Sequence, residues 1–140
     1  MSIEPGKVEI IAELGSGHLG DFNRAIAMIH EAAACGASGV KMQLFRADSL
    51  DSRPEIQAKL RPYELPLEWL EELSTAAHSH HLKFGVTPFA INLVESLRNL
   101  TDFVKISAYD LTYRGLIKAA ARLGKPVILS TAMGTWGEIE

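Results

Sequence analysis

The chain has 140 residues, of which 47% are hydrophobic and 22% are charged, a balance that is ordinary for a folded protein. Its net charge of −3 gives no reason to expect a nucleic-acid or anionic-membrane partner. No apolar run approaches the roughly 18 residues that a membrane-spanning helix needs. The single cysteine, Cys35, cannot form an internal disulfide, and residues 1–5 lack the basic and apolar regions of a signal peptide. We therefore expect a cytoplasmic protein without a nucleic-acid or membrane partner.

Short apolar runs alternate with longer amphipathic stretches along the whole chain, which predicts alternating strands and helices. The first strand is expected at residues 8–12, followed by glycine-rich residues 15–20 and a helix that Asp21 caps and Gly36 ends. Further strands are expected at residues 39–44, 83–87, 103–107 and 126–130, with helices at about residues 67–77, 90–100 and 113–123. Right-handed crossovers between such units give a parallel sheet, whose strands we expect to be apolar on both faces.

The connection between the second strand and the second helix, residues 46–66, is long and polar and contains prolines. Loops of this length inside compact domains are more often functional than filler. We therefore expect residues 46–66 to form a loop at the rim of the site and to act as a candidate substrate lid.

Two architectures fit this order of elements. A complete (β/α)₈ barrel takes roughly 250 residues, so this chain would supply about four and a half of its units. A doubly wound sheet would be complete at this length, and Gly15–Gly20 matches its G-x-G-x-x-G phosphate fingerprint. However, Lys41 and Gln43 lie where the acidic residue of a dinucleotide site is expected, which disfavours that function. Periodicity alone leaves both architectures open.

Polar residues follow or end each of the five expected strands. They are Glu13, Lys41 and Gln43, Thr87, Lys105 and Ser107, and Ser130 and Thr131. In parallel α/β folds the carboxyl ends of the strands form one rim, where chemistry takes place. Lys41 and Lys105 each follow a valine in an apolar strand, and a lone buried ammonium group is costly, so together they predict a bound phosphate or carboxylate. The alternative is that these lysines are solvated, or are paired with Glu13 and Asp110.

The histidines have both structural and functional interpretations. His78, His80 and His81 lie in the last turn of an expected helix, where imidazolium complements the helix dipole, and this favours a structural role over metal binding. His18 lies in the rim loop after the first strand, where contact with substrate and a structural role in the loop are both consistent with its position.

Four segments in order, Ile11–Gly20, Val40–Gln43, Val104–Asp110 and Gly124–Met133, resemble the N-acetylneuraminate (sialic acid) synthase family. The resemblance implies a (β/α)₈ TIM barrel, an α/β fold, with residues 1–140 as its N-terminal part and no second domain. It also implies an enzyme that condenses phosphoenolpyruvate with an N-acetylated amino sugar, N-acetylmannosamine or a related hexose, to give a nonulosonic acid and phosphate.

The same resemblance assigns roles to residues of this chain. Glu13 and Asp110 are the catalytic candidates, and the substrate-binding candidates are Lys41, Gln43, Lys105, Ser107, Ser130 and His18. The family implies a divalent metal ion, Mn²⁺ or Mg²⁺, and we expect its ligands beyond residue 140 rather than in this chain. The substrates are small molecules, and we expect a homo-oligomer.

Three positions depart from the family pattern: Gly17 replaces an asparagine, Ala108 a serine and Asp110 a glutamate. Each change shortens or removes a polar group, so either a changed sugar or a loss of activity would follow. Two alternative functions stay open: a non-catalytic half-barrel that binds anions or assembles with another chain, and another phosphoenolpyruvate-dependent enzyme such as a deoxy-heptulosonate synthase. Half a barrel leaves its outer strands unpaired, so the isolated chain is expected to associate or to belong to a longer polypeptide, and to be inactive alone.

Overall fold

The computed structural model describes residues 8–132 and 134–139. The strands are β1 (Ile11–Gly15), β2 (Gly39–Leu44), β3 (Lys83–Pro88), β4 (Phe103–Ile106) and β5 (Val127–Leu129). The helices are α1 (Phe22–Ala34), α2 (Ala47–Leu50), α3 (Pro54–Leu60), α4 (Leu70–Ser79), α5 (Ile91–Val94), α6 (Arg114–Ala121) and α7 (Trp136–Ile139). Short 3₁₀ turns are η1 (Arg61–Tyr63), η2 (Leu67–Trp69), η3 (Glu95–Leu97) and η4 (Ala108–Asp110). Each strand and helix expected from the sequence is therefore present.

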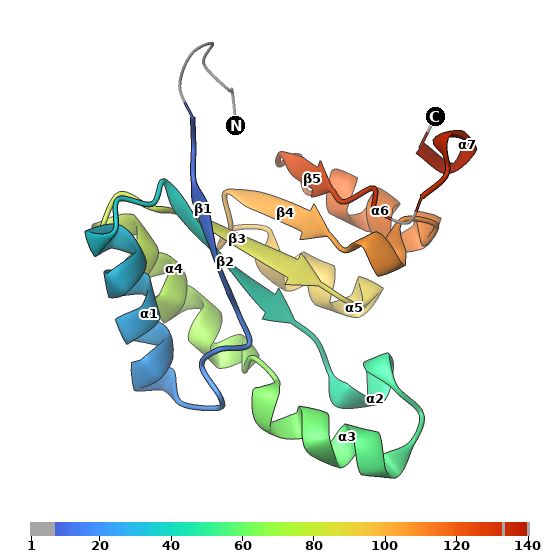
Figure 1. The fold of residues 1–140 in the computed structure, drawn as a ribbon, viewed down its shortest axis with the longest axis horizontal. Coiled ribbons are helices and arrows are strands. Elements are labelled where there is room, and N and C mark those ends of the chain that lie inside the picture. The colour runs from blue at the N-terminus through green and yellow to red at the C-terminus, as the bar shows by residue number, and fades with distance from the viewer. Residues whose placement is uncertain (1–7, 133, 140) are drawn as a thin grey trace.

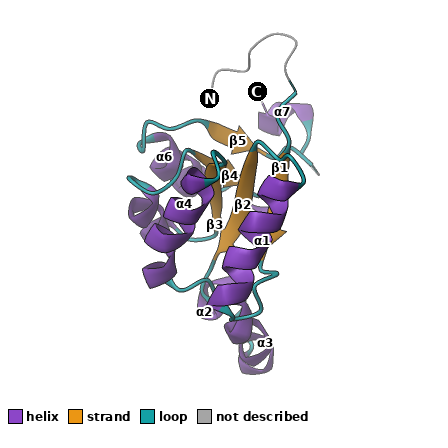
Figure 2. Ribbon diagram, turned by 90° about the vertical axis from the view of Figure 1, so that its left-hand side faces the viewer, coloured by secondary structure: helices purple, strands orange, loops and turns teal. Residues whose placement is uncertain are grey.

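The five strands form one parallel sheet in the order β1-β2-β3-β4-β5. The long helices α1, α4 and α6 all cover the same face of this sheet (Figures 1 and 2). A doubly wound sheet would reverse the strand order near its middle and carry helices on both faces, and this sheet does neither. The fold is part of a (β/α)₈ barrel, as expected from the resemblance.

The covered face of the sheet holds the apolar core. The strand residues that face it are Val40, Met42, Leu44, Phe84, Val86, Val104 and Ile106, all fully buried. They pack against buried side chains of the helices, among them Ile29 of α1, Leu73 of α4 and Leu116 of α6. Because burying one such side chain contributes about 1.5–3 kcal/mol, this face supplies most of the hydrophobic stabilisation.

The first strand begins three residues later than expected. Ile11 of β1 is paired with Gly39 of β2, and pairing continues through Glu13 opposite Lys41. Val8 and Ile10, which belong to the expected strand, are 83% and 62% exposed. The apolar residues before Ile11 extend beyond the sheet, so Glu13 lies inside the strand rather than after it.

Helix α1 follows the predicted capping pattern. Asp21 precedes the helix in an extended conformation, and its carboxylate accepts a hydrogen bond from the backbone N–H of Arg24 at 3.1 Å. Gly36 adopts a φ of +79° just after the helix, a conformation that favours glycine. The expected start and end of this helix are confirmed.

Residues 46–66 lie beyond the carboxyl end of β2, as expected, but they are not an irregular loop (Figure 1). The segment contains α2, α3 and η1. Glu64 holds it in place, because its carboxylate pairs with Arg46 at 3.0 Å and accepts the backbone N–H of Ala47 at 2.7 Å. Leu65 beside it is fully buried. The expected position is confirmed and the expected loop is wrong, while a role as a lid stays a prediction.

The strands are not apolar on both faces. The face covered by helices is apolar throughout, whereas on the other face β1 and β2 carry Glu13, Lys41 and Gln43. This uncovered face is the concave face of the partial barrel. Among the described residues, no helix is long and apolar enough to cross a membrane.

Candidate functional site

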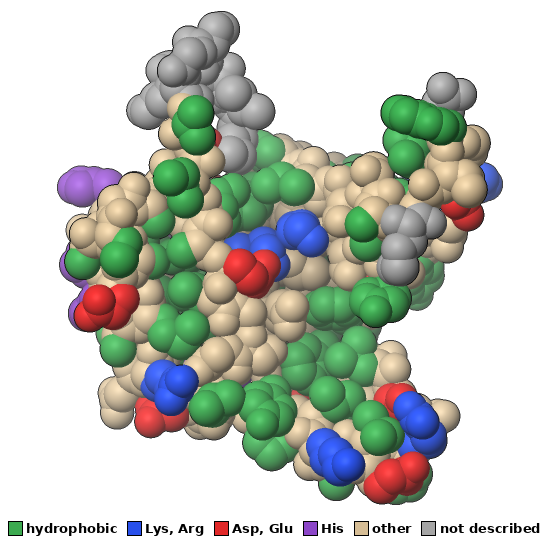
Figure 3. Space-filling model, viewed as in Figure 1, with side chains coloured by type: hydrophobic (Ala, Val, Ile, Leu, Met, Phe, Trp, Pro, Cys, Tyr) green, Lys and Arg blue, Asp and Glu red, His purple; other side chains and the backbone are tan. Residues whose placement is uncertain are grey.

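Polar side chains gather on the concave face because alternate residues of each strand point the same way. In the parallel register, Glu13 of β1 lies beside Lys41 of β2, and Gln43 of β2 lies beside Thr87 of β3. Figure 3 shows basic and acidic side chains together near the middle of this face, over the strands. The expected clustering of polar residues from several strands is present here.

Lys41 is the most deeply buried charged residue of this cluster, with 5% of its surface exposed. Its Nζ lies 2.5 Å from Glu13 Oε2 and donates a hydrogen bond to Thr87 Oγ1 at 2.7 Å. Burial lowers the pKa of Lys41, the hydrogen bond and charge of Glu13 act to raise it, and the positive charge of Lys105 lowers it further. The alternative in which Lys41 is paired with Glu13 is therefore the observed arrangement.

Lys105 of β4 lies near enough to Lys41 for its charge to lower the pKa of that lysine. Unlike Lys41, it has no ion pair or side-chain hydrogen bond with any residue in the described ranges. The expected pairing with Asp110 is absent there, since Asp110 Oδ2 is buried and has no hydrogen-bond partner among the same residues. The site thus holds one cation that Glu13 neutralises and a second that is free to meet an anion.

An apolar surface lies between the two lysines. Gly85 of β3 is paired with Lys41 on one side and with Phe103 of β4 on the other. A Cβ atom on Gly85 would lie 2.1 Å from the ring of Phe103, so only glycine leaves room for this ring. Phe103 is fully buried although it does not belong to the core under the helices. Neither residue was among the predicted site residues, although a glycine inside a strand pattern indicates a close approach by another group.

Gln43 lies at the carboxyl end of β2, on the same face as Lys41. Its side-chain Oε1 accepts a hydrogen bond from the hydroxyl of Ser16 at 3.2 Å. Ser16 comes directly after β1 and was not among the predicted site residues. The structure therefore brings together Glu13, Lys41, Gln43 and Lys105 and adds Ser16, Thr87, Gly85 and Phe103 to them.

Asp110 and Ser107 lie at η4, directly after β4. The hydroxyl of Ser107 accepts a hydrogen bond from the backbone N–H of Tyr109 at 3.4 Å and so caps this turn. Burial raises the pKa of Asp110. Burial therefore disfavours the charged form of this carboxyl group relative to that of an exposed aspartate. Contact of either residue with substrate stays a prediction.

Ser130 and His18 were also expected at the site. Ser130 follows β5, and its backbone N–H donates to the carbonyl of Ile106 at 3.1 Å. His18 is fully buried beside Trp69, with their ring centroids 5.8 Å apart, and its Nδ1 accepts the backbone N–H of Gly20 at 3.0 Å. Burial lowers the pKa of His18, which keeps the ring neutral. These contacts give His18 a structural role in the loop, and its contact with substrate stays a prediction.

The histidines at the end of α4 lie at the amino-terminal end of the strands. His78 Nε2 lies 2.8 Å from Asp102 Oδ2, while the ring of His80 contacts that of His30 edge to face. Within residues 8–132 and 134–139, no group of three or more His, Cys, Asp or Glu side chains could hold a metal ion. Glu13 alone offers one carboxylate, which is already paired with Lys41, so we assign no metal to these residues.

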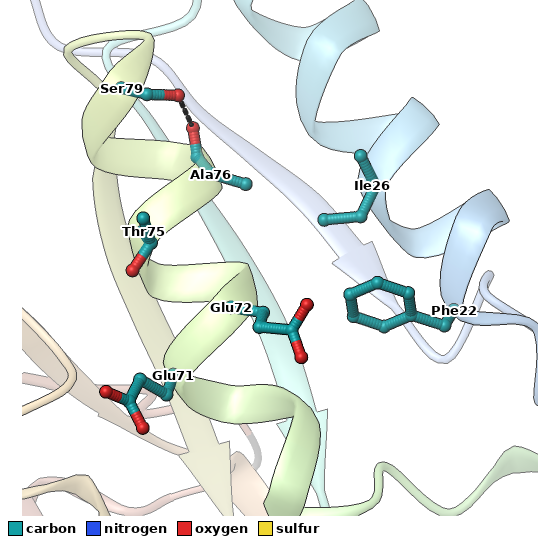
Figure 4. Close-up of a pocket in the computed structure, with 7 residues that line it drawn as sticks. All are labelled: Phe22, Ile26, Glu71, Glu72, Thr75, Ala76 and Ser79. Atoms are coloured by element: carbon teal, nitrogen blue, oxygen red, sulfur yellow. Dashed lines mark hydrogen bonds between the residues drawn. The ribbon is translucent and has the colours of Figure 1, made fainter.

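A separate groove of about 410 Å³ lies on the helix side of the sheet, between α1 and α4 (Figure 4). Phe22 and Ile26 of α1 face Glu72 and Ala76 of α4 across it, and Glu71, Thr75 and Ser79 complete its lining. This groove has no cationic side chain in its lining and lies on the opposite face of the sheet from the lysines. It is not part of the candidate site.

The chain is similar to several biosynthetic enzymes. Two curated relatives are each 36% identical to this chain, over 132 and 153 residues. The second is the N,N'-diacetyllegionaminic acid synthase of Campylobacter jejuni, and its alignment covers 96% of this chain and 45% of that protein. The crystal structure of the N-acetylneuraminic acid synthetase of Leptospira borgpetersenii superposes with a TM-score of 0.89, at 29% identity, over 99% of this chain and 52% of that one. A truncated deoxy-heptulosonate 7-phosphate synthase of Thermotoga maritima, at 16% identity and a TM-score of 0.65, shares the fold.

This chain spans about half the length, or less, of the curated relatives it matches. The resemblance to the sialic acid synthases is confirmed by relatives that are named for legionaminic, pseudaminic and sialic acid synthesis. The match to a family model extends over most of the chain. Residues 28–140 match the model of the NeuB family, and the chain therefore belongs to that family.

Proposed function

We propose that this chain is the first part of a synthase barrel that condenses phosphoenolpyruvate with an N-acetylated amino sugar, N-acetylmannosamine or a related hexose. The products are a nonulosonic acid and phosphate. The observation that carries this proposal is the ammonium group of Lys105, which has no partner among the described residues, beside the neutralised pair of Lys41 and Glu13 on the open face of a NeuB-family barrel.

The charges of the site suit phosphoenolpyruvate, which carries a phosphate and a carboxylate. Lys105 supplies a cation that is unpaired within the described part of the chain, and Lys41 supplies a second whose partner, Glu13, is half exposed. Charge-assisted hydrogen bonds of this kind are roughly twice as strong as neutral ones. The ring of Phe103, which packs over Gly85 between β2 and β4, offers an apolar surface that would exclude water from one side of a bound anion. Ser107 and Ser130 are assigned in this proposal to add hydroxyl donors around it.

The reaction makes one carbon–carbon bond and releases phosphate. C3 of phosphoenolpyruvate attacks the aldehyde carbon of the open-chain sugar, whose oxygen gains a proton as the bond forms. The carbon at C2 becomes positive, water adds there and loses a proton, and the C2–phosphate oxygen bond is then broken. Asp110 is assigned to donate the proton to the aldehyde oxygen, and burial raises the pKa of its carboxyl group, the direction that a general acid requires. Glu13, as a carboxylate, is suited to balance positive charge at C2.

A divalent metal ion, Mn²⁺ or Mg²⁺, would polarise the aldehyde oxygen as a Lewis acid. We propose that the ligands of this metal ion lie beyond residue 140. Gln43 and His18 are assigned to binding of the sugar. A cytoplasmic location and a homo-oligomeric state belong to the same proposal.

The proposal is tested by titrating phosphoenolpyruvate into the protein in a calorimeter. The Lys105→Met variant is expected to bind it about 10–100-fold more weakly, because it loses a charge-assisted hydrogen bond. Lys118→Met, which removes an exposed lysine of α6, serves as the matched control and should bind like the wild type. Equal binding by wild type and Lys105→Met would overturn the proposal.

Catalysis is tested by release of phosphate from phosphoenolpyruvate in the presence of N-acetylmannosamine and manganese. A polypeptide that extends past Glu140 through the rest of the barrel should turn over, and the 140-residue chain should not. Binding of phosphoenolpyruvate by the longer protein without any release of phosphate would favour the non-catalytic anion-binding module instead.

A further inference from the structure

We propose that Ser16 is a positioning residue that holds the side-chain amide of Gln43 with its N–H groups directed to the open concave side. The site then recognises an acceptor oxygen of the sugar, a carbonyl or hydroxyl oxygen, by hydrogen-bond donation from Gln43. This inference rests on the proposed function, which it extends to a specificity-determining contact with the sugar.

The chain reaches this geometry through a bulge at the end of β1. Glu13 is paired with Lys41, but Gly15 is paired with Met42, so the register between the two strands shifts by one residue. Gly15 adopts a φ of +56°, a left-handed conformation that suits glycine. The chain therefore turns toward β2 directly after the strand, and the hydroxyl of Ser16 donates to Gln43 Oε1 at 3.2 Å.

This hydrogen bond lies at the edge of the candidate site and not in a remote loop. A Cβ atom on Gly15 would lie 3.6 Å from Glu13 Oε1 and 4.0 Å from Gln43 Cδ. The carboxylate of Glu13 and the amide of Gln43 therefore line the same small space beside Gly15. Glu13 in turn pairs with Lys41, so the amide that Ser16 holds borders the same space as the partner of the buried ammonium.

The chemistry of the amide gives the direction of recognition. A glutamine side chain has one oxygen that accepts and one NH₂ group with two donors. The hydroxyl of Ser16 donates a hydrogen bond to this oxygen. Within the described residues, nothing accepts a hydrogen bond from the NH₂ group of Gln43. Without Ser16, the terminal torsion of Gln43 is broad and roughly two-fold, so the oxygen and the NH₂ group would exchange places freely. A ligand oxygen would then meet another acceptor half of the time.

Kinetics in the barrel-length polypeptide test this role. Ser16→Ala is expected to raise KM for N-acetylmannosamine about twofold, because the amide then presents its NH₂ group to the sugar only half of the time, while KM for phosphoenolpyruvate stays unchanged. Ser16→Thr keeps a hydroxyl at the same place and should restore the wild-type KM. An equal rise in both KM values, or failure of threonine to restore the lower one, would contradict a positioning role.

A double-mutant cycle separates action through Gln43 from a general effect on the loop. In a Gln43→Ala background, Ser16→Ala should have no further effect on KM for the sugar. The same twofold rise in both backgrounds would overturn the inference.

A measurement without substrate distinguishes failure of this inference from failure of the proposed function. The ¹⁵N relaxation of the side-chain NH₂ group of Gln43 should show a rigid amide in the wild type and in Ser16→Thr, and a mobile one in Ser16→Ala. A mobile amide in the wild type would overturn the inference even if the enzyme is active. If the amide of Gln43 is rigid but the protein does not bind phosphoenolpyruvate, the positioning role of Ser16 stands and only the proposed reaction is rejected.

Discussion

The two faces of the sheet differ in what they contribute, although their side chains alternate along the same strands. On β2, Val40, Met42 and Leu44 are fully buried against helices, while Lys41 and Gln43 between them point to the concave face. The covered face tolerates only apolar groups because its helices exclude water. The open face tolerates a buried ammonium because Glu13 and Thr87 pair with it. One strand thus supplies stability and chemistry at alternate positions.

The largest expected effect comes from the covered face. Phe84→Ala removes a fully buried aromatic side chain of β3 from the core. We expect the free energy of unfolding to fall by about 3–5 kcal/mol, from lost burial and the cavity left behind. Urea denaturation followed by circular dichroism measures it. Tyr109→Ala, which removes an aromatic ring that is 84% exposed, should change stability by less than about 0.5 kcal/mol. Similar losses for both would remove the contrast between core and rim.

The second prediction concerns the apolar part of the concave face. Gly85→Ala would place a Cβ atom 2.1 Å from the ring of Phe103, and we expect a loss of about 1–3 kcal/mol from overpacking. Gly137→Ala is the matched control, because a Cβ atom there has nothing within 4 Å and the residue lies in a helix. A second change, Phe103→Leu, should recover part of the loss of Gly85→Ala. No recovery would mean that the two residues do not share this space.

The third prediction is that Lys41→Met stabilises the fold while it weakens binding of phosphoenolpyruvate. Glu13 is 51% exposed, so its carboxylate stays solvated when its partner is removed, and an apolar side chain avoids the cost of burying a charge. We expect the free energy of unfolding to rise by about 1 kcal/mol, as is common where a residue needed for function destabilises the fold. Thermal unfolding and calorimetry on the same samples measure both effects. A loss of stability would show that the ion pair itself stabilises this face.

The lowered pKa of Lys41 predicts the direction in which folding stability changes with pH. Its folded-state pKa is lowered from the ordinary value of 10.5, so the unfolded chain binds more protons between the two pKa values. Stability of the wild type should therefore rise as the pH increases through this window, relative to Lys41→Met. A constant difference between the two proteins from neutral pH to pH 10.5 would contradict the lowered pKa.

The order of elements could be predicted because strand and helix periods are local properties, and Asp21 and Gly36 carry local capping signals. The contacts that shape the site are not local. The helices between residues 46 and 66 depend on Glu64, whose carboxylate accepts the N–H of Ala47 at the start of α2. The expectation of a loop was wrong because this contact joins residues 17 positions apart, which the periodicity of a sequence does not reveal.

The candidate site divides in the same way. Lys41 and Lys105 could be identified because a charged residue inside an apolar strand is conspicuous in a sequence. The pairing of Lys41 with Glu13 depends on the register of β1, which a sequence pattern does not give, and the expected strand was three residues too early. The contact between Ser16 and Gln43 depends on a bulge in the same strand. The residue types of the site are therefore readable from the sequence, whereas their partners require the register.

The smallest expected effect lies at the opposite end of the strands, where residues of a barrel serve stability rather than catalysis. Asp102 precedes β4, and its Oδ2 accepts the backbone N–H of Phe84 at 2.7 Å and lies 2.8 Å from His78 Nε2. Burial acts to raise the pKa of Asp102, but the hydrogen bonds from Phe84 and His78, with the charges of His78 and Lys125, lower it overall. Because the side chain is 41% exposed, solvent screening limits the effect, and Asp102→Asn should cost about 0.5 kcal/mol at neutral pH.

Stability measured at acidic pH tests the contribution of the Asp102 carboxylate. A carboxylate with a lowered folded-state pKa stabilises the fold above its unfolded pKa, and this contribution disappears as the pH falls through 3.8 toward the folded value. The difference in stability between wild type and Asp102→Asn should therefore shrink on acidification and leave phosphoenolpyruvate binding at neutral pH unchanged. A difference that persists at pH 2 would assign the effect to packing of the amide, and weakened binding would show that the two ends of the strands are energetically coupled.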